Sequence, residues 1–225
     1  MKIVFSIGGS ILAPDNIDKN FVKKLALLLT DLSEKNKLAV VIGGGAPARK
    51  KINNTRKSGK SEAYCDYIGI LATRNNAKAL IKALGKKANN KILETIVDAG
   101  NSFGKKILVM GGTEPGHSTD AVAALLAEWV KTDLLINATN VDGVYNKDPK
   151  KNKDAKLIKK INIKKLFGLV LKESMGAGKY ALIDLITIKV IQRSNIRTII
   201  LNGHDLENIK MAISGKKFRG TIVTF

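Results

Sequence analysis

The sequence predicts an α/β fold, a three-layer αβα sandwich built on a mainly parallel central sheet. Short runs rich in Val, Ile and Leu alternate along the chain with longer segments whose apolar residues recur every three to four positions. Alternating strands and helices of this kind favour a parallel sheet with helices on both faces. The 225 residues suffice to bury one such core, and no linker or repeat divides them. We therefore expect one domain over residues 1–225.

The apolar runs give the expected elements in chain order. Strands are predicted at residues 2–8, 38–43, 106–111, 134–140, 198–203 and 221–225. Helices are predicted at about residues 21–32, 62–84, 122–130, 162–172, 181–194 and 205–214. Asp18 is a suitable cap for the first of these helices. The third helix carries an apolar stripe formed by Val122, Leu125, Leu126, Trp129 and Val130.

Three predicted strands end in glycine clusters, at residues 7–10, 42–49 and 110–116. In a parallel sheet these strand ends meet at one edge, where ligands bind. Backbone without a Cβ lets N–H groups turn toward an anion, and a following helix N-terminus adds its dipole. One such cluster is also typical of a tight turn, but three at one edge favour phosphate binding.

The net charge of +20 allows two interpretations, a nucleic-acid-binding surface or a lysine-rich solvated one. Only six of the 39 basic residues are arginine, the residue that base readout and phosphate clamps favour. The lysines are spread along the chain, and their densest run, residues 147–165, has no aromatic residue on which a base could stack. We therefore expect a solvated surface that attracts anionic nucleotides, and nucleic acid is not expected as a partner.

Several other functional classes fit the sequence poorly. Asn54 stands where a P-loop ending in GKS needs its first glycine, and Tyr180 in GAGKY replaces the Ser or Thr that would hold magnesium. The two histidines and the single cysteine have no zinc-ligand spacing. We expect Cys65 to pack in a helix and His204 to lie in a turn, whereas His117 could contact a ligand.

The N-terminal stretch lacks the apolar core of a signal peptide, and no segment reaches the roughly 18 apolar residues of a membrane span. A single cysteine cannot form an intramolecular disulfide. We therefore expect a cytoplasmic protein without a membrane partner.

Five blocks then occur in a specific order. They are IGGS (7–10), VVIGGGAPAR (40–49), D-x-IG-x-x-ATRNNA (66–77), VMGGTEPGHSTDAVAALLAE (109–128) and ATNVDGVYNKDP (138–149). Together they resemble the amino acid kinase superfamily, and within it most the archaeal type of UMP kinase, over essentially the full length. The segments GGTEPGHSTDA and TNVDGVY-x-x-DP are the most specific.

The resemblance implies an acceptor lobe for UMP at about residues 1–130 and an ATP lobe at about residues 131–225. The implied catalytic residues are Asp120, which would organise the transfer site, together with Arg49 and Lys179. The implied ATP-binding residues are Gly8, Gly9, Ser10, Gly45, Arg49, Thr139, Asn140, Tyr145 and Asp148. The implied UMP-binding residues are Gly44, Asp66, Thr113, Glu114, Pro115, Gly116, His117, Ser118 and Thr119.

The residues allow simpler roles too. Asp120 could merely favour a helix N-terminus, and Asp148 before Pro149 could merely form a turn. For a kinase of this type, Asp66 suits ribose hydroxyls because a carboxylate accepts hydrogen bonds.

The implied chemistry is transfer of the γ-phosphate of ATP to UMP. A phosphate oxygen of UMP is largely ionised at neutral pH, so no general base is needed. Catalysis then depends on positioning and positive charge, including Mg²⁺ that arrives with ATP, and no metal ligand is expected from the protein. The resemblance also suggests a homohexamer.

One position departs from the resemblance. Many superfamily members carry a lysine two residues before the first glycine pair, and here that place is Ser6. A serine cannot neutralise a γ-phosphate. Our hypothesis is that Lys179 or Lys189 supplies the missing charge.

Two alternatives stay open at this point. The chain could be another kinase of the superfamily, acting on an amino acid, a carbamate or an isoprenoid phosphate. It could also be an inactive nucleotide- or RNA-binding regulator, which the high charge and Ser6 would favour. The block from 66 to 77 and the presence of Asp120 with Arg49 favour UMP kinase over both.

Overall fold

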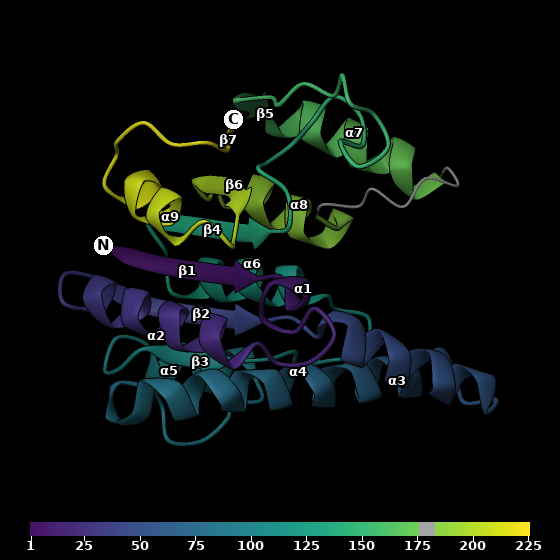
Figure 1. The fold of residues 1–225 in the computed structure, drawn as a ribbon, viewed down its shortest axis with the longest axis vertical. Coiled ribbons are helices and arrows are strands. Elements are labelled where there is room, and N and C mark those ends of the chain that lie inside the picture. Colours follow the sequence, from purple (N-terminus) through teal and green to yellow (C-terminus); the bar gives the residue numbers. More distant parts are fainter. Residues whose placement is uncertain (176–182) are drawn as a thin grey trace.

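The computed structural model describes residues 1–175 and 183–225 and has the predicted α/β architecture (Figure 1). Within these residues, seven strands form one sheet in the order β3-β2-β1-β4-β6-β7-β5. The pairings are parallel except for the antiparallel pair β6 and β7. The strands are β1 (Lys2–Ile7), β2 (Lys37–Ile42), β3 (Leu108–Met110), β4 (Leu134–Thr139), β5 (Lys160–Asn162), β6 (Thr198–Asn202) and β7 (Thr221–Thr224).

Helices cover both faces of the sheet, as a three-layer sandwich requires. Side chains alternate between faces along a strand, so Ile3 and Phe5 of β1 pack under α2, α4 and α9, whereas Val4 packs under α5, α6, α7 and α8. The helices are α1 (Gly9–Leu12), α2 (Lys19–Ser33), α3 (Gly45–Lys57), α4 (Glu62–Leu84), α5 (Ile96–Ser102), α6 (Thr119–Trp129), α7 (Ile163–Met175), α8 (Leu185–Arg193) and α9 (Leu206–Ile213), with a 3₁₀ turn η1 (Gly85–Lys87).

The predicted strands and helices are present within the described residues, with differences in some of their bounds. Helix α4 has the predicted bounds, and Asp18 caps α2 by accepting hydrogen bonds from the N–H groups of Asn20 and Phe21. Cys65 is buried in α4 and His204 lies in a turn, as predicted.

Helices α1, α3 and α5, the 3₁₀ turn η1 and strand β5 were not predicted. Helix α3 is mostly polar and buries only Gly45 and Ala48, so it has no apolar period to detect. Strand β3 is shorter than predicted, because Ile107 forms only an isolated bridge with Ala88 before the regular pairing begins.

Trp129 is a correction to the apolar stripe predicted for α6. The helix forms, and Val122 and Leu126 are buried, but Trp129 is 51% exposed. Its ring covers Gly100 of α5, where an added Cβ would lie 2.1 Å from the Trp129 Cδ1 atom. The side chain therefore packs between two helices at the surface and not in the core.

The sheet continues without a break from β1 to β4, across the predicted lobe division near residue 130. The division into lobes stays a prediction. None of the helices in the described ranges combines the length and the apolar character that crossing a bilayer demands.

Candidate functional site

The carboxyl ends of β1, β2, β3, β4 and β6 meet at one edge of the sheet, and the three glycine clusters follow the first three of them. Main-chain hydrogen bonds hold the clusters beside one another. The Gly43 N–H donates to Ile7 O (2.9 Å), and the Gly8 N–H donates to Ala138 O (2.9 Å). The predicted gathering of glycine loops at this edge is confirmed.

The first two glycine loops interlock backbone to backbone. A Cβ added at Gly9 would lie 1.9 Å from the Gly45 nitrogen, so any side chain at residue 9 would drive the loops apart. Gly45 has φ +69°, and a Cβ there would lie 2.3 Å from Ala13 O. These two glycines are therefore required for packing between the loops, in addition to any ligand that the loops bind.

Helix α4 braces the second and third glycine loops. The Asn76 amide donates to Gly43 O (2.9 Å) and Gly44 O (3.1 Å). Thr73 Oγ1 accepts from the N–H of Gly112 (2.7 Å). One helix thus fixes loops that follow two different strands.

Arg74 of α4 holds the loop that follows β3. Its guanidinium donates to Gly112 O (3.1 Å) and Thr113 O (3.3 Å) and pairs with Glu94 (2.6 Å). Only 14% of the Arg74 side chain is exposed, so it acts as a support for the loop and not as a free cation.

A cavity of about 420 Å³ opens at this edge between α3, α4 and the loop that follows β3. It is large enough for a small ligand. Eight predicted site residues line it together: Gly44, Gly45, Arg49, Asp66, Gly116, His117, Ser118 and Thr119. Gly45 and Arg49, which the resemblance assigns to ATP, thus share this cavity with the residues assigned to UMP.

Asp66 already holds one end of the loop in place, because its Oδ2 accepts a hydrogen bond from the N–H of Gly116 (2.9 Å). Its carboxylate is partly exposed toward the cavity. Thr113 is buried, whereas Glu114 and Pro115 are exposed, and none of the three is among the residues that line the cavity.

Asp120 lies in the first turn of α6 and turns toward the sheet. Its Oδ1 accepts hydrogen bonds from Ser6 Oγ (2.5 Å) and from the Asn137 amide (3.0 Å). Ser6 and Asn137 are register partners on β1 and β4, so both point to the same face. Asp120 Oδ2 has no hydrogen-bond partner among the described residues. These contacts give Asp120 more than the simple helix-end role.

Asp184 lies near Asp120 and joins α6 to α8. It caps α8 through the N–H of Thr187 (2.8 Å), and it accepts a short hydrogen bond from Ser118, the N-cap of α6. The pKa of Asp120 is raised to about 6, mainly by burial and in smaller part by the negative charge of Asp184, while the hydrogen bonds from Ser6 and Asn137 lower it and so limit the rise. A carboxylate with a raised pKa in a glycine-lined site is a functional-site candidate.

The residues predicted to bind ATP occupy two places. Gly8, Gly9 and Ser10 form the turn into α1, between β1 and the second glycine loop. Thr139 and Asn140 follow at the end of β4, and the Gly203 N–H donates to Thr139 O (2.8 Å).

Tyr145 and Asp148 lie further along the same segment. The Tyr145 hydroxyl donates to Asp142 (3.2 Å), and Asp142 pairs with Arg219 (2.7 Å). Asp148 Oδ1 accepts from the N–H of Lys150 (2.9 Å), so its carboxylate at least shapes a turn. Its predicted contact with ATP stays a prediction.

Of the two lysines predicted to supply the missing positive charge, the structure describes only Lys189. Lys179 lies outside the described residues. Lys189 is exposed on α8, and no ion pair links it to Asp120 within residues 1–175 and 183–225.

Comparison with known proteins agrees with this geometry. The family model described as "Amino acid kinase family" matches residues 1–202. The chain belongs to this family. Within the family, the chain is 45% identical to the uridylate kinase of Methanobrevibacter smithii over 225 residues, which is 100% of both chains. It is 46% identical to the uridylate kinase of Thermococcus kodakarensis over 224 residues, 99% of each chain.

The same family likeness holds in three dimensions. A crystal structure of the uridylate kinase from Archaeoglobus fulgidus superposes with a TM-score of 0.87 at 40% identity, covering 100% of both chains. The predicted amino acid kinase fold is therefore confirmed.

Sequence reasoning missed the supporting residues of the site. Asn137 was a polar residue inside an apolar strand, and buried polar groups usually have a partner, so the signal was present. Asp184 precedes an apolar helical run, which is typical of an N-cap. Arg74 gave no such signal, because its hydrogen-bond partners, Gly112 and Thr113, lie 38 and 39 positions away from it in the sequence.

Proposed function

We propose that this amino acid kinase family member is a uridylate kinase that transfers the γ-phosphate of ATP to UMP, giving UDP and ADP. The observation that carries the proposal is the cavity in which Asp66, Arg49 and residues 116–119 meet at the sheet edge beside Asp120. Full-length likeness to curated uridylate kinases supports it.

The cavity residues suit UMP as acceptor. The free oxygen of Asp66 would accept hydrogen bonds from ribose hydroxyls while Oδ2 keeps the N–H of Gly116. The backbone around Gly44 would hold the phosphate of UMP, and we propose that Arg49, which the resemblance assigns to ATP, also reaches that phosphate because it lines the same cavity. Because Arg74 fixes the loop from 111 to 113, the acceptor loop would need little ordering when UMP binds.

ATP would lie on the other side of the interlocked glycine loops, against Gly8, Ser10 and the segment from Thr139 to Asp148. Among the described residues no group of three or more His, Cys, Asp or Glu side chains could hold a metal alone. We propose that Mg²⁺ arrives with ATP and is held by the ATP phosphates and water. Mg²⁺ supplies charge neutralisation when it is bound.

In the transfer step, an ionised phosphate oxygen of UMP attacks the γ-phosphorus as the bond to the β-phosphate oxygen of ATP breaks. No proton has to be removed. The protein's part is to align two polyanions, with Asp120 orienting the cationic groups. We propose Lys179 as the cation that replaces a first-strand lysine, with Lys189 as the second candidate, and a homohexamer as the assembly.

An ADP-release assay with ATP and Mg²⁺ tests the proposal, comparing UMP with CMP, dUMP, acetylglutamate and isopentenyl phosphate as acceptors. We expect turnover with UMP to exceed that with the last two by at least 100-fold. Asp66→Ala should raise KM for UMP with a smaller change in kcat, since Asp66 holds the acceptor and not the transferred group. Turnover with acetylglutamate or isopentenyl phosphate alone would overturn the assigned acceptor.

The same assay tests the cations through Lys179→Ala and Lys189→Ala. Unchanged kcat in both variants would exclude both lysines as the missing charge. A folded chain that binds ATP but turns over no acceptor would favour a nucleotide-binding regulator.

A further inference from the structure

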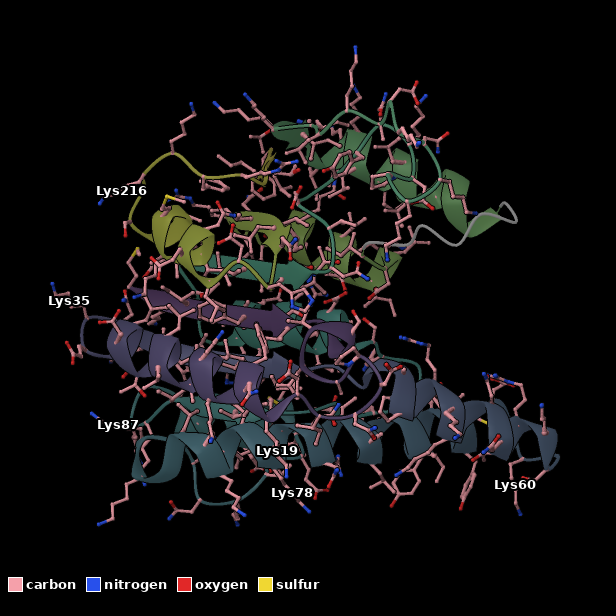
Figure 2. All side chains as sticks on the ribbon, viewed as in Figure 1. Lys19, Lys35, Lys60, Lys78, Lys87 and Lys216 are labelled. Carbon is pink, nitrogen blue, oxygen red and sulfur yellow. The ribbon has the colours of Figure 1, made fainter. Side chains whose placement is uncertain are left out.

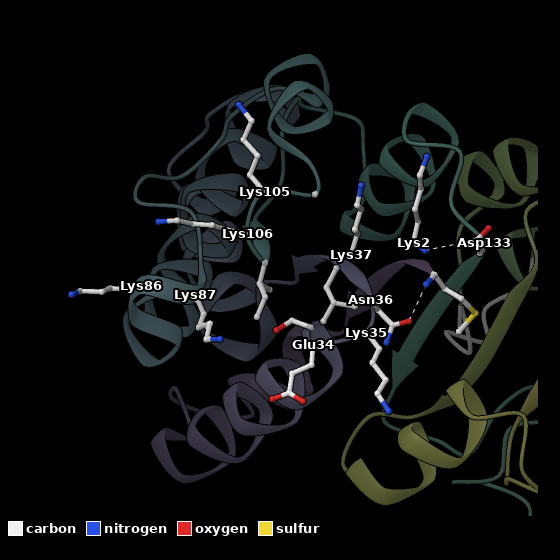
Figure 3. A pocket seen from close by; sticks show the side chains of 15 residues that line it. Lys2, Glu34, Lys35, Asn36, Lys37, Lys86, Lys87, Lys105, Lys106 and Asp133 are labelled. Carbon is white, nitrogen blue, oxygen red and sulfur yellow. Dashed lines mark hydrogen bonds between the residues drawn. The ribbon is translucent and has the colours of Figure 1, made fainter.

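A second, larger hollow lies at the opposite end of the sheet, where β1 and β2 begin (Figure 3). Its volume is about 790 Å³. It is lined by residues from the start of β1, the turn between α2 and β2, the 3₁₀ turn η1 and the segment before β3. We call it the basic groove, because its lysines are Lys2, Lys35, Lys37, Lys86, Lys87, Lys105 and Lys106.

The fold gathers these lysines from four separate parts of the sequence. In the linear sequence they look like an even scatter, which is why the sequence favoured a plain solvated surface. The parallel sheet brings the turns before β1, β2 and β3 to one edge, and each turn contributes lysines. In Figure 2, Lys35 and Lys87 project from this end of the molecule, whereas Lys60 lies at the opposite end.

The positive charge of the basic groove is not balanced locally. Among the described residues that line it, two are acidic, Glu34 and Asp133, against seven lysines. Asp133 is already occupied by the N–H of Lys2 (2.7 Å). Lys2 Nζ donates to Val130 O (2.8 Å) and Lys106 Nζ to Asn90 (3.1 Å), so these two ammonium groups have neutral partners.

The other five lysines, Lys35, Lys37, Lys86, Lys87 and Lys105, make no side-chain hydrogen bond or ion pair within the described part of the chain. Like charges held around one hollow repel each other and raise the free energy of the folded chain. An anion with several charges would remove that cost and would gain from release of its counterions. The groove is therefore poised for a polyanion.

The kind of polyanion follows from what the groove lacks. It has no arginine to clamp a carboxylate or a single phosphate in bidentate geometry, and no aromatic side chain on which a base could stack. Its ammonium groups do not converge on one point, because Lys86 and Lys106 point away from Lys37 across the hollow. Spread ammonium groups match charges repeated along an extended chain and match a compact anion less well.

We propose that the basic groove binds the phosphate backbone of an RNA strand without reading its bases. The lysines neutralise successive phosphates, and the absence of arginine and aromatic residues leaves the sequence of the strand unread. The site lies at the sheet edge opposite the glycine loops, so binding does not require the kinase cavity.

The test measures fluorescence anisotropy of a labelled 12-nucleotide oligouridylate with the full-length chain over 50–300 mM salt. In the groove variant, Lys35, Lys37, Lys87 and Lys105 are all replaced by Gln. In a matched control, Lys159, Lys160, Lys164 and Lys165, all exposed around β5 and α7, are replaced by Gln. Both variants lose the same charge, and circular dichroism and thermal unfolding verify that both are folded.

We expect the groove variant to bind the oligomer at least tenfold more weakly at 50 mM salt. The slope of log affinity against log salt should become shallower by about 2 to 3, since each lost phosphate contact on a single strand removes about 0.7. The control should change affinity by less than twofold. A 12-mer of adenosine should bind like the uridine oligomer, because the groove does not read bases.

Three results would overturn the proposal. Equal losses in the groove variant and the control would show general charge attraction without a site. Equal affinity for a 12-residue polyglutamate would point to an acidic protein as partner. Inorganic tripolyphosphate that displaces the RNA at the RNA's own Kd would show a site for small polyphosphates.

Discussion

The two edges of the sheet carry two different kinds of candidate site for a negatively charged ligand. At the carboxyl edge, glycine backbone, the exposed Arg49 and the carboxylate of Asp66, which accepts a hydrogen bond from Gly116, line a cavity of about 420 Å³. At the amino edge, seven lysines surround a larger hollow of about 790 Å³. The first arrangement positions a ligand through fixed hydrogen bonds, whereas the second only attracts it.

The two edges differ in how firmly contacts with other elements fix the positions of their residues. Every loop at the carboxyl edge is held by a contact from another element, such as Asn76 to the second glycine loop or Arg74 to the third. Within residues 1–175 and 183–225, the side chains of Lys35, Lys37, Lys86, Lys87 and Lys105 have no hydrogen bond or ion pair that would hold them in a similar way. Substitutions at the carboxyl edge should therefore have large, position-specific effects, and those at the amino edge small, additive ones.

The largest effect is expected from Gly9→Ala. The added Cβ meets the Gly45 nitrogen at 1.9 Å, and main-chain atoms cannot move aside as a side chain can. We expect a loss of about 3 kcal/mol or more in the free energy of unfolding and no measurable turnover. Urea unfolding and the ADP-release assay measure both.

Gly168→Ala is the matched control. Gly168 lies in α7, and an added Cβ would meet no described atom within 4 Å other than those of its chain neighbours and its own helix backbone, so alanine there should stabilise by about 0.5–1 kcal/mol. A similar result at residues 9 and 168 would contradict the interlocking of the loops.

The next effect is expected from Asp120→Asn. The change keeps the size of the side chain and its contacts with Ser6 and Asn137 but removes the negative charge. We expect kcat to fall by about 10²–10³-fold, which is typical for loss of one preorganised electrostatic group. A kcat within fivefold of the wild type would exclude Asp120 from the transfer site.

The same substitution should lower kcat but raise the free energy of unfolding, and the size of that rise should depend on pH. The pKa of Asp120 is raised to about 6 from an ordinary 3.8, so the folded state keeps this proton longer than the unfolded state does. The contribution of Asp120 to the free energy of unfolding is therefore most favourable below about pH 4. It decreases as the pH rises to about 6 and remains at its least favourable value above that.

Between pH 4 and pH 7, Asp120→Asn should thus gain about 1–3 kcal/mol relative to the wild type. Urea unfolding of both proteins at several pH values measures the difference. A difference that does not vary with pH would show that burial does not perturb this carboxyl group.

The smallest effect is expected at the amino edge. Lys35→Gln combined with Lys37→Gln removes two unpaired like charges, so the free energy of unfolding should rise by about 0.2–0.5 kcal/mol at low salt. The gain should disappear at 0.5 M salt, where exposed charges are screened. A loss of stability would show that these lysines have stabilising partners.

The fold was predictable because its strands are apolar and β-branched, the first three end in glycine clusters, and α2, α7, α8 and α9 have clear apolar periods. Eight of the residues that line the candidate cavity were predicted as site residues through the family's sequence blocks. Their supports were not, since Arg74, Asn137 and Asp184 act through contacts between segments far apart in the sequence. For the same reason the sequence concealed the basic groove, whose lysines become neighbours only in the folded sheet.

The interlock of Gly9 with Gly45 has a mechanical consequence. Two loops that touch through main-chain atoms behave as one stiff body, so neither can be displaced without carrying the other. If ATP and UMP bind on opposite sides of these two loops, the distance between the reacting phosphates is set by main-chain atoms and not by rotatable side chains. Thermal motion then moves both nucleotides together and leaves their separation nearly constant.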